Sequence, residues 1–154
     1  MSSIAFPKLN FPSYAFRLKT AGSRSKIFDE VRKCWVLLTP EEWVRQHTVR
    51  WLVEEKKYAS SLLALEKSIE VNGLEKRCDI VAYNTMGKPI LIVECKATSV
   101  EISQEVFDQT ARYNLTLEVD LFLITNGLRH FCCSIDHENK SYNFLPELPS
   151  FLAF

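Results

Sequence analysis

Residues 89–98, PILIVECKAT, carry charged side chains at the end of an aliphatic run. Side chains alternate between the two faces of a strand, so Glu94 and Lys96 are expected to point the same way. The preceding apolar stretch, residues 78–82, holds one acid, Asp79. If the two stretches pair as neighbouring antiparallel strands, Asp79 can lie across from the end of the second strand. Two carboxylates and an amine would then converge at one end of a sheet.

This group of three side chains has two chemical interpretations. Two carboxylates, together with the backbone carbonyl of Cys95 and water, supply the oxygen ligands that Mg²⁺ prefers. Such a metal activates water and stabilises charge on a phosphoryl oxygen, and the Lys96 ammonium can hold the attacking water. The alternative is an exposed cross-strand salt bridge, which contributes about 0.2–1 kcal/mol. The spacing alone leaves both interpretations open.

The composition indicates an ordinary globular chain. It has 154 residues, of which 47% are hydrophobic and 25% are charged, and its net charge is zero, which suits one domain. No apolar run approaches the roughly 18 residues of a membrane helix, and no signal peptide pattern is visible. The five cysteines include no C-x-x-C pair, which is typical of reduced thiols. We therefore expect a cytoplasmic protein with no membrane partner.

The hydrophobic periodicity and the turn signals predict an α/β fold. Thr39, Pro40 and Glu42 have the types and spacing of a helix N-terminus with a capping box. Two or three short strands are expected before this helix. From there the patterns predict a helix, a three-strand meander, a second helix, a strand and a final hairpin: residues 39–57, 62–71, 77–84, 89–97, 101–117, 119–125, 129–134 and 141–144.

This order predicts one mixed sheet flanked by helices. We expect a single domain over residues 1–154. It would consist of an N-terminal β extension at 1–38, a core at 39–126, and a C-terminal hairpin and tail at 127–154.

The order of the acids resembles the PD-(D/E)xK nuclease superfamily. Asp79 on one strand and Glu94-Cys95-Lys96 on the next match its pattern, with Cys78 in the place of the proline. On the following helix, Gln109 and Tyr113 form the Q-x-x-x-Y motif of RecB-like nucleases and of the N-terminal nuclease domain of type I restriction R subunits. Over residues 38–145 the chain resembles that domain, through the stretches EEWVRQ, EKRCDIVAYN, LIVECKAT, FDQTARYN and ITNG.

The resemblance implies a restriction-endonuclease-like core and a Mg²⁺-dependent endonuclease that hydrolyses DNA, with Mn²⁺ as a substitute metal. It implies Asp79, Glu94 and Lys96 as catalytic residues. Asp79, Glu94 and the Cys95 backbone carbonyl would bind the metal, joined by Glu42, for which the capping box is an equal alternative. The sequence has no glycine-rich phosphate-binding loop, so the resemblance covers the nuclease module of a restriction–modification enzyme and not its ATPase motor.

Further residues are expected to position DNA. Gln109 and Tyr113 share a helix face, and they can reach the DNA backbone or Lys96. Arg24 and Lys26 belong to a basic stretch at 17–33 that can contact phosphates or simply face water. Because the net charge is zero, we expect DNA binding by the isolated domain to be weak.

Two other functions stay open from the sequence. The chain could be a catalytically weak nucleic-acid-binding module, or a protein-interaction module, that retains the nuclease fold. Protein partners and a homodimer are equally open.

Overall fold

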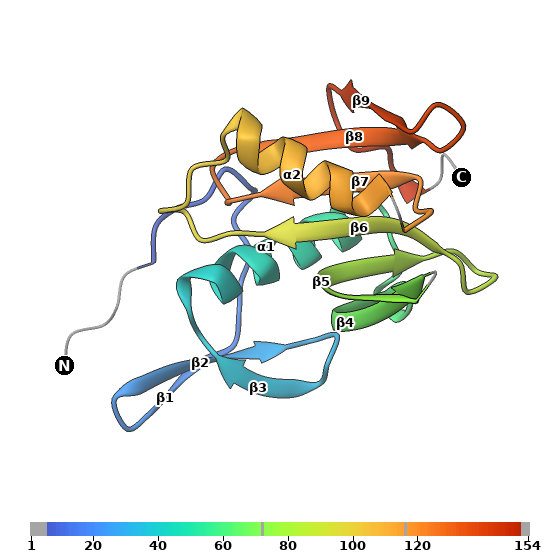
Figure 1. The fold of residues 1–154 in the computed structure, drawn as a ribbon. Coiled ribbons are helices and arrows are strands. Elements are labelled where there is room, and N and C mark those ends of the chain that lie inside the picture. Colours follow the sequence, from blue (N-terminus) through green and yellow to red (C-terminus); the bar gives the residue numbers. More distant parts are fainter. Residues whose placement is uncertain (1–5, 72, 116, 152–154) are drawn as a thin grey trace.

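The part of the chain that the structure describes forms two β-sheets and two α-helices. The computed structural model describes residues 6–71, 73–115 and 117–151, and Figure 1 shows a small three-stranded sheet beside a larger sheet that carries the helices. The small sheet contains β1 (Leu18–Ala21), β2 (Arg24–Asp29) and β3 (Cys34–Leu37) in that order. The helices are α1 (Pro40–Glu54) and α2 (Gln104–Leu115), and a short 3₁₀ turn, η1, spans Ser60–Leu62.

The larger sheet has six strands in sequence order. They are β4 (Leu63–Val71), β5 (Leu74–Tyr83), β6 (Pro89–Cys95), β7 (Leu121–Thr125), β8 (His130–Asp136) and β9 (Ser141–Leu145). β6 and β7 are parallel, because α2 crosses between them, and all other neighbours are antiparallel. The expected α/β class with a mixed sheet is confirmed, as is the order of helix, three strands, helix and strand.

The two helices cover opposite faces of the six-stranded sheet (Figure 1). Val44 and Leu52 of α1 pack on one face in a cluster that includes Val93. Phe107 of α2 packs on the other face in a cluster that includes Ile92. All five residues of β7 are buried, as expected for a central strand that is covered on both sides.

Both helices differ from the expected boundaries for local reasons. α1 ends at Glu54 rather than at residue 57, because Lys57 adopts a left-handed conformation with φ of 64° that cannot continue the helix. α2 begins at Gln104 rather than at residue 101, because the Ser103 hydroxyl accepts the backbone N–H of Val106 at 3.2 Å and caps the helix there. Neither helix in the described part of the chain is long and apolar enough to span a membrane.

Gly127 fixes the turn after β7 against α1. Its φ is +86°, which favours glycine, and an added Cβ would lie 2.8 Å from Leu9 and 3.1 Å from Val44. The backbone N–H of Asn10 also donates to the Gly127 carbonyl at 2.7 Å. The N-terminal segment, α1 and the end of β7 are therefore held together, close to the strand ends that carry the candidate site.

Candidate active site

Asp79 lies where the pairing between β5 and β6 ends. The last paired residues are Ile80 and Val93, so Asp79 is one position beyond the ladder. Its Oδ2 accepts the backbone N–H of Cys95 at 2.7 Å, and its Oδ1 lies 3.3 Å from a guanidinium nitrogen of Arg45 on α1. The carboxylate thus bridges the end of β6 and the first helix.

Glu94 is the neighbour of Asp79 on the adjacent strand. Continuing the β5–β6 register by one position places the two acids opposite each other. The Glu94 side chain is 14% exposed, and its Oε1 lies 2.6 Å from Nζ of Lys76. Burial raises the pKa of Glu94, the charge of Lys76 lowers it, and the charge of Asp79 raises it again. The two carboxylates therefore interact, and Lys76 offsets their repulsion.

Lys96 follows Glu94 at the end of β6. Its backbone N–H donates to the Thr125 carbonyl at 2.8 Å, which continues the parallel pairing that Cys95 makes with Thr125. The charge of Lys96 lowers the pKa of Glu94, though by less than the charge of Lys76 does. Burial raises the pKa of the Cys95 thiol well above its usual value, so this side chain stays a neutral part of the core. The structure therefore groups Asp79, Glu94 and Lys96 at one strand end and adds Lys76 to them.

Arg45 is a buried cation that joins several acids of the site. Its side chain is 6% exposed and lies within ion-pair distance of four carboxylates. Burial disfavours the guanidinium charge, but Glu42 and Asp79 together raise the pKa of Arg45 above its ordinary value. Because a buried charge is tolerated only when it is paired, Arg45 is held by these acids and holds them in turn. The four distances are 3.0 Å to Glu41, 2.8 Å to Glu42, 3.3 Å to Glu66 and 3.3 Å to Asp79.

Glu66 brings a further acid to the same region from β4. It has a φ of 50°, which is uncommon for a residue other than glycine. The β4–β5 ladder omits the position where Glu66 and Asp79 would pair, although the register is the same on both sides of it. Burial opposes ionisation of Glu66, yet neighbouring arginines bring its pKa below the ordinary value. These partners are Arg45, Arg32 and Arg77.

Glu42 combines a capping role with ion pairs. Its backbone N–H donates to the Thr39 hydroxyl at 3.0 Å, so the expected N-cap of α1 is present. Its carboxylate accepts hydrogen bonds from Arg32 at 3.0 Å, Arg45 at 2.8 Å and Gln46 at 3.1 Å. To bind a metal, Glu42 would have to exchange one of these partners.

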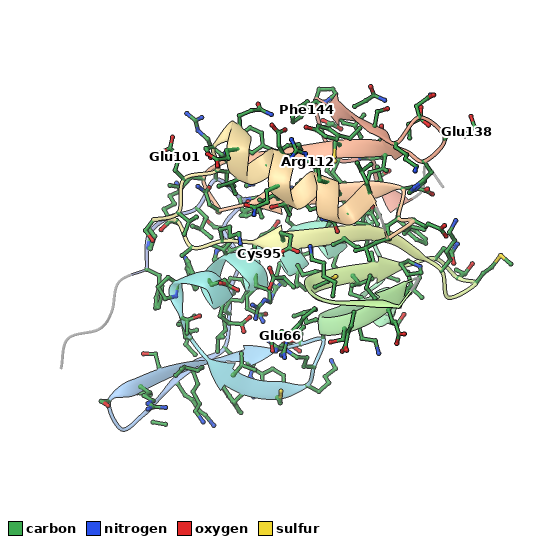
Figure 2. All side chains as sticks on the ribbon, in the orientation of Figure 1. Glu66, Cys95, Glu101, Arg112, Glu138 and Phe144 are labelled. Carbon is green, nitrogen blue, oxygen red and sulfur yellow. The ribbon has the colours of Figure 1, made fainter. Side chains whose placement is uncertain are left out.

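Asp29 ties the three-stranded sheet to the site. It is fully buried, and its carboxylate accepts from the side chains of Arg32 and Gln46 and from the backbone N–H of Val31. Arg32 then extends from Asp29 to Glu42 and Glu66. Figure 2 shows Glu66 between the three-stranded sheet and β4, and Cys95 at the end of β6. The polar network therefore runs from β2 through α1 to Glu66 in β4, to Asp79 in β5 and to the end of β6.

The donor set fits a metal that needs few protein ligands. Within residues 6–71, 73–115 and 117–151, no three acidic, histidine or cysteine side chains converge as a metal cluster. Mg²⁺, however, is usually held by one or two carboxylates, with water and substrate phosphates completing its shell. Asp79 and Glu94 are two neighbouring, largely buried carboxylates whose charges are balanced by cations. A divalent cation could balance the negative charges of the two carboxylates in place of these cations.

Among the residues expected to position DNA, the described side chains of Gln109, Arg24 and Lys26 make none of these contacts. Gln109 is exposed on α2 and lines an open surface hollow with Glu105, Asp108 and Arg112. The side chain of Tyr113 lies outside the part of the chain that the structure describes. Arg24 and Lys26 stand on β2, in the three-stranded sheet.

Sequence reasoning missed the cations of the site. Arg45 carried a signal, because it follows Glu41 and Glu42 by one helical turn in EEWVRQ, and such pairs meet on a helix. Lys76 carried none, since its partner Glu94 lies on another strand. Arg32 was seen only as part of a basic stretch, although it contacts three buried or half-buried acids.

Two comparisons with known proteins give matches. A family model described as "Type I restriction enzyme R protein N terminus (HSDR_N)" matches residues 40–149. Among solved structures, the chain is similar to a fragment described as an HsdR subunit of a type I restriction enzyme from Vibrio vulnificus YJ016, with 20% identity and a TM-score of 0.46. That match covers 69% of this chain and only 23% of the other. No curated protein matches the sequence significantly.

Proposed function

Because the chain belongs to the family of type I restriction enzyme R protein N termini, we propose that it is a nuclease domain that hydrolyses DNA phosphodiester bonds with Mg²⁺. The observation that carries this proposal is the pair of neighbouring acids, Asp79 and Glu94, at the point where the pairing of β5 with β6 ends. Ordinary surface salt bridges are exposed. Here the carboxylates are 19% and 14% exposed, and each has a largely buried cationic partner.

The proposed fold is a restriction-endonuclease-like core. The arrangement of α1, the meander β4–β5–β6, the crossover helix α2 and the parallel strand β7 supports it. Such a core brings acids from adjacent strands close together, and here Asp79 contacts α1 through Arg45.

In this proposal Asp79 and Glu94 hold the metal, and the Cys95 backbone carbonyl is a third ligand. Asp79 is positioned for this by the Cys95 N–H and by Arg45. When bound, Mg²⁺ would supply an activated water and would stabilise charge on the phosphate. Lys96, beside Glu94, would orient that water and offset charge on the reacting phosphate.

The remaining residues have supporting roles in the proposal. Lys76 opposes the burial that raises the pKa of Glu94, and Arg45 forms an ion pair with Asp79. Glu42 is proposed to reach the metal by exchanging an arginine partner. Gln109 and Tyr113 are proposed to contact the DNA backbone. Mn²⁺ should replace Mg²⁺, because it also accepts oxygen ligands.

A second candidate is a nucleic-acid-binding module that retains the fold without useful turnover. One observation favours it: Lys76 pairs with Glu94 and Arg45 pairs with Asp79, so both acids have cationic partners within the protein. A buried ion-pair network of this kind can persist for its effect on the fold.

A nuclease assay on supercoiled and linear DNA decides between these candidates. Wild-type protein should cleave with Mg²⁺ or Mn²⁺ and should be inactive in chelator. Lys96→Ala should lose cleavage. The matched control is Lys88→Ala, an exposed lysine in the loop between β5 and β6, which should cleave like wild type. Absence of cleavage by wild-type protein in either metal, or full activity of Lys96→Ala, would reject the catalytic proposal.

A further inference from the structure

The outer face of the three-stranded sheet is basic. The register pairs Lys19 with Lys26 and Phe28 with Trp35, and partners in an antiparallel pair lie on the same face. By strand alternation, Arg24 shares the face of Lys26 and Phe28. Arg17 joins them, because the backbone N–H of Phe28 donates to its carbonyl. We call these residues the outer face: Arg17, Lys19, Arg24, Lys26, Phe28 and Trp35.

The opposite face of this sheet is already used by the fold. Ile27 and Asp29, which alternate with Lys26 and Phe28, are fully buried. Asp29 makes the contacts with Arg32 and Gln46 that lead to the candidate active site. The orientation of the sheet is therefore fixed, and its outer face points to solvent.

The aromatic rings of the outer face hold cations in place. The guanidinium of Arg17 lies 4.3 Å from the ring centre of Phe28, and the ammonium of Lys19 lies 4.2 Å from that of Trp35. Such cation–π contacts limit the freedom of long side chains without neutralising their charge. The cations are therefore ordered in advance of any partner, which lowers the entropic cost of binding.

The charges on this face lack acidic partners in the local sequence. Residues 16–28 and 34–37 contain no acidic residue. The one acid within β2, Asp29, is buried on the opposite face of the sheet. Lys19 and Lys26 lie directly opposite each other, and like charges in that position destabilise a sheet. A polyanion bound to this face would remove that repulsion.

We propose that the outer face of the β1–β3 sheet binds the phosphate backbone of duplex DNA, independently of the metal site. The sheet ends at residue 37, before the family match at 40–149 begins. Its outer face is therefore a surface outside the part of the chain that matches the family. The inference deepens the proposed function by naming where DNA docks. It requires no catalytic turnover.

Duplex DNA is the partner that the chemistry favours. Proteins that bind single strands offer uncovered aromatic rings on which bases stack. Here Phe28 and Trp35 are half-buried and are covered by Arg17 and Lys19, so the face offers charge rather than stacking. Binding should therefore be insensitive to sequence and should weaken steeply with salt.

The test is a fluorescence anisotropy titration of a labelled DNA duplex at several salt concentrations, in chelator so that metal chemistry plays no part. The variant Lys19→Gln/Arg24→Gln removes two exposed cations of the outer face. Its control, Lys88→Gln/Lys140→Gln, removes two exposed lysines from loops of the six-stranded sheet and changes the net charge equally. Matching urea midpoints would show that both variants are folded.

The outer-face variant should bind DNA about 10- to 60-fold more weakly at 0.1 M salt, and its salt slope should fall by about 1.8, since each phosphate contact contributes about 0.9. The control should bind like wild type. Equal losses in both double variants, or none in either, would overturn the proposal. Tighter binding of a single strand than of the duplex would refute the duplex assignment. Competition by polyglutamate as effective as by DNA would point instead to an acidic protein. None of these results depends on whether the metal site is catalytic.

Discussion

Replacing Lys76 by methionine should destabilise the metal-free protein markedly at neutral pH. Lys76 and Glu94 are each 14% exposed and lie 2.6 Å apart. Removing one partner of a buried ion pair costs about 3–5 kcal/mol. Because both side chains keep some contact with water, we expect the lower end, about 3 kcal/mol. With a urea dependence of about 2 kcal/mol per molar, the unfolding midpoint should fall by about 1.5 M.

The pH dependence of this loss has a definite sign. Burial raises the pKa of Glu94 above its ordinary value of 4.5. A group with a raised folded-state pKa contributes stability that is fully present below its unfolded pKa and is lost as the pH rises through the folded pKa. Without Lys76 the pKa of Glu94 should rise further, so the difference between variant and wild type should be small near pH 4 and large at pH 7.

Urea unfolding at pH 4 and pH 7, with and without Mn²⁺, measures this effect. Saturating metal should restore part of the stability of Lys76→Met, because binding at 100 times Kd contributes about 2.7 kcal/mol. The control is Lys67→Met, an exposed lysine on β4, which should stay within about 0.5 kcal/mol of wild type. Equal stability of Lys76→Met and wild type at pH 7 would refute the reasoning about the buried pair.

Three further predictions concern the helices. Gln109→Ala and Tyr113→Phe should each lower DNA cleavage or binding with little change in melting temperature, because each removes only a polar group. A large decrease of the melting temperature in both variants would identify them as packing residues. Thr39→Ala should lower the free energy of unfolding by about 1 kcal/mol, because it removes the N-cap of α1, and an unchanged urea midpoint would count against this. Burial lowers the pKa of His47 below 6.5, so its contribution to stability is present above pH 6.5 and is lost as the pH falls through the folded-state pKa. His47→Gln should therefore flatten the dependence of unfolding free energy on pH in this range, and an unchanged dependence would contradict the prediction.

The elements of the fold could be predicted because their signals are local. Thr39, Pro40 and Glu42 marked the start of α1 correctly, and the apolar run before Glu94 formed the buried strand β6. Periodicity was less informative at helix ends. There, a single conformation such as that of Lys57, or a cap such as Ser103, decides the boundary.

The proximity of the acids in the candidate site could be predicted from the sequence, but their cationic partners could not. Glu94 and Lys96 are two residues apart in the chain, and Asp79 lies on the preceding strand of the same hairpin. The cations come from elsewhere: Arg45 reaches Asp79 from α1, and Lys76 reaches Glu94 from the far part of β5. Which cation meets which acid depends on how α1 packs and where the β5–β6 pairing ends, and neither leaves a periodic pattern in the sequence.

Asp79 and Glu94 are proposed to form together a divalent-metal site beside Lys96. Calorimetric titration of Mn²⁺ into the wild-type protein, Asp79→Asn, Glu94→Gln and Lys96→Met tests it most directly. Wild-type protein should bind Mn²⁺, and either acid variant should lose binding, because one remaining carboxylate provides too little charge to hold the ion. Lys96→Met should bind at least as tightly as wild type, since a neighbouring positive charge has been removed. If wild-type protein binds no Mn²⁺ at millimolar concentration, or if the acid variants bind it unchanged, the claim is contradicted.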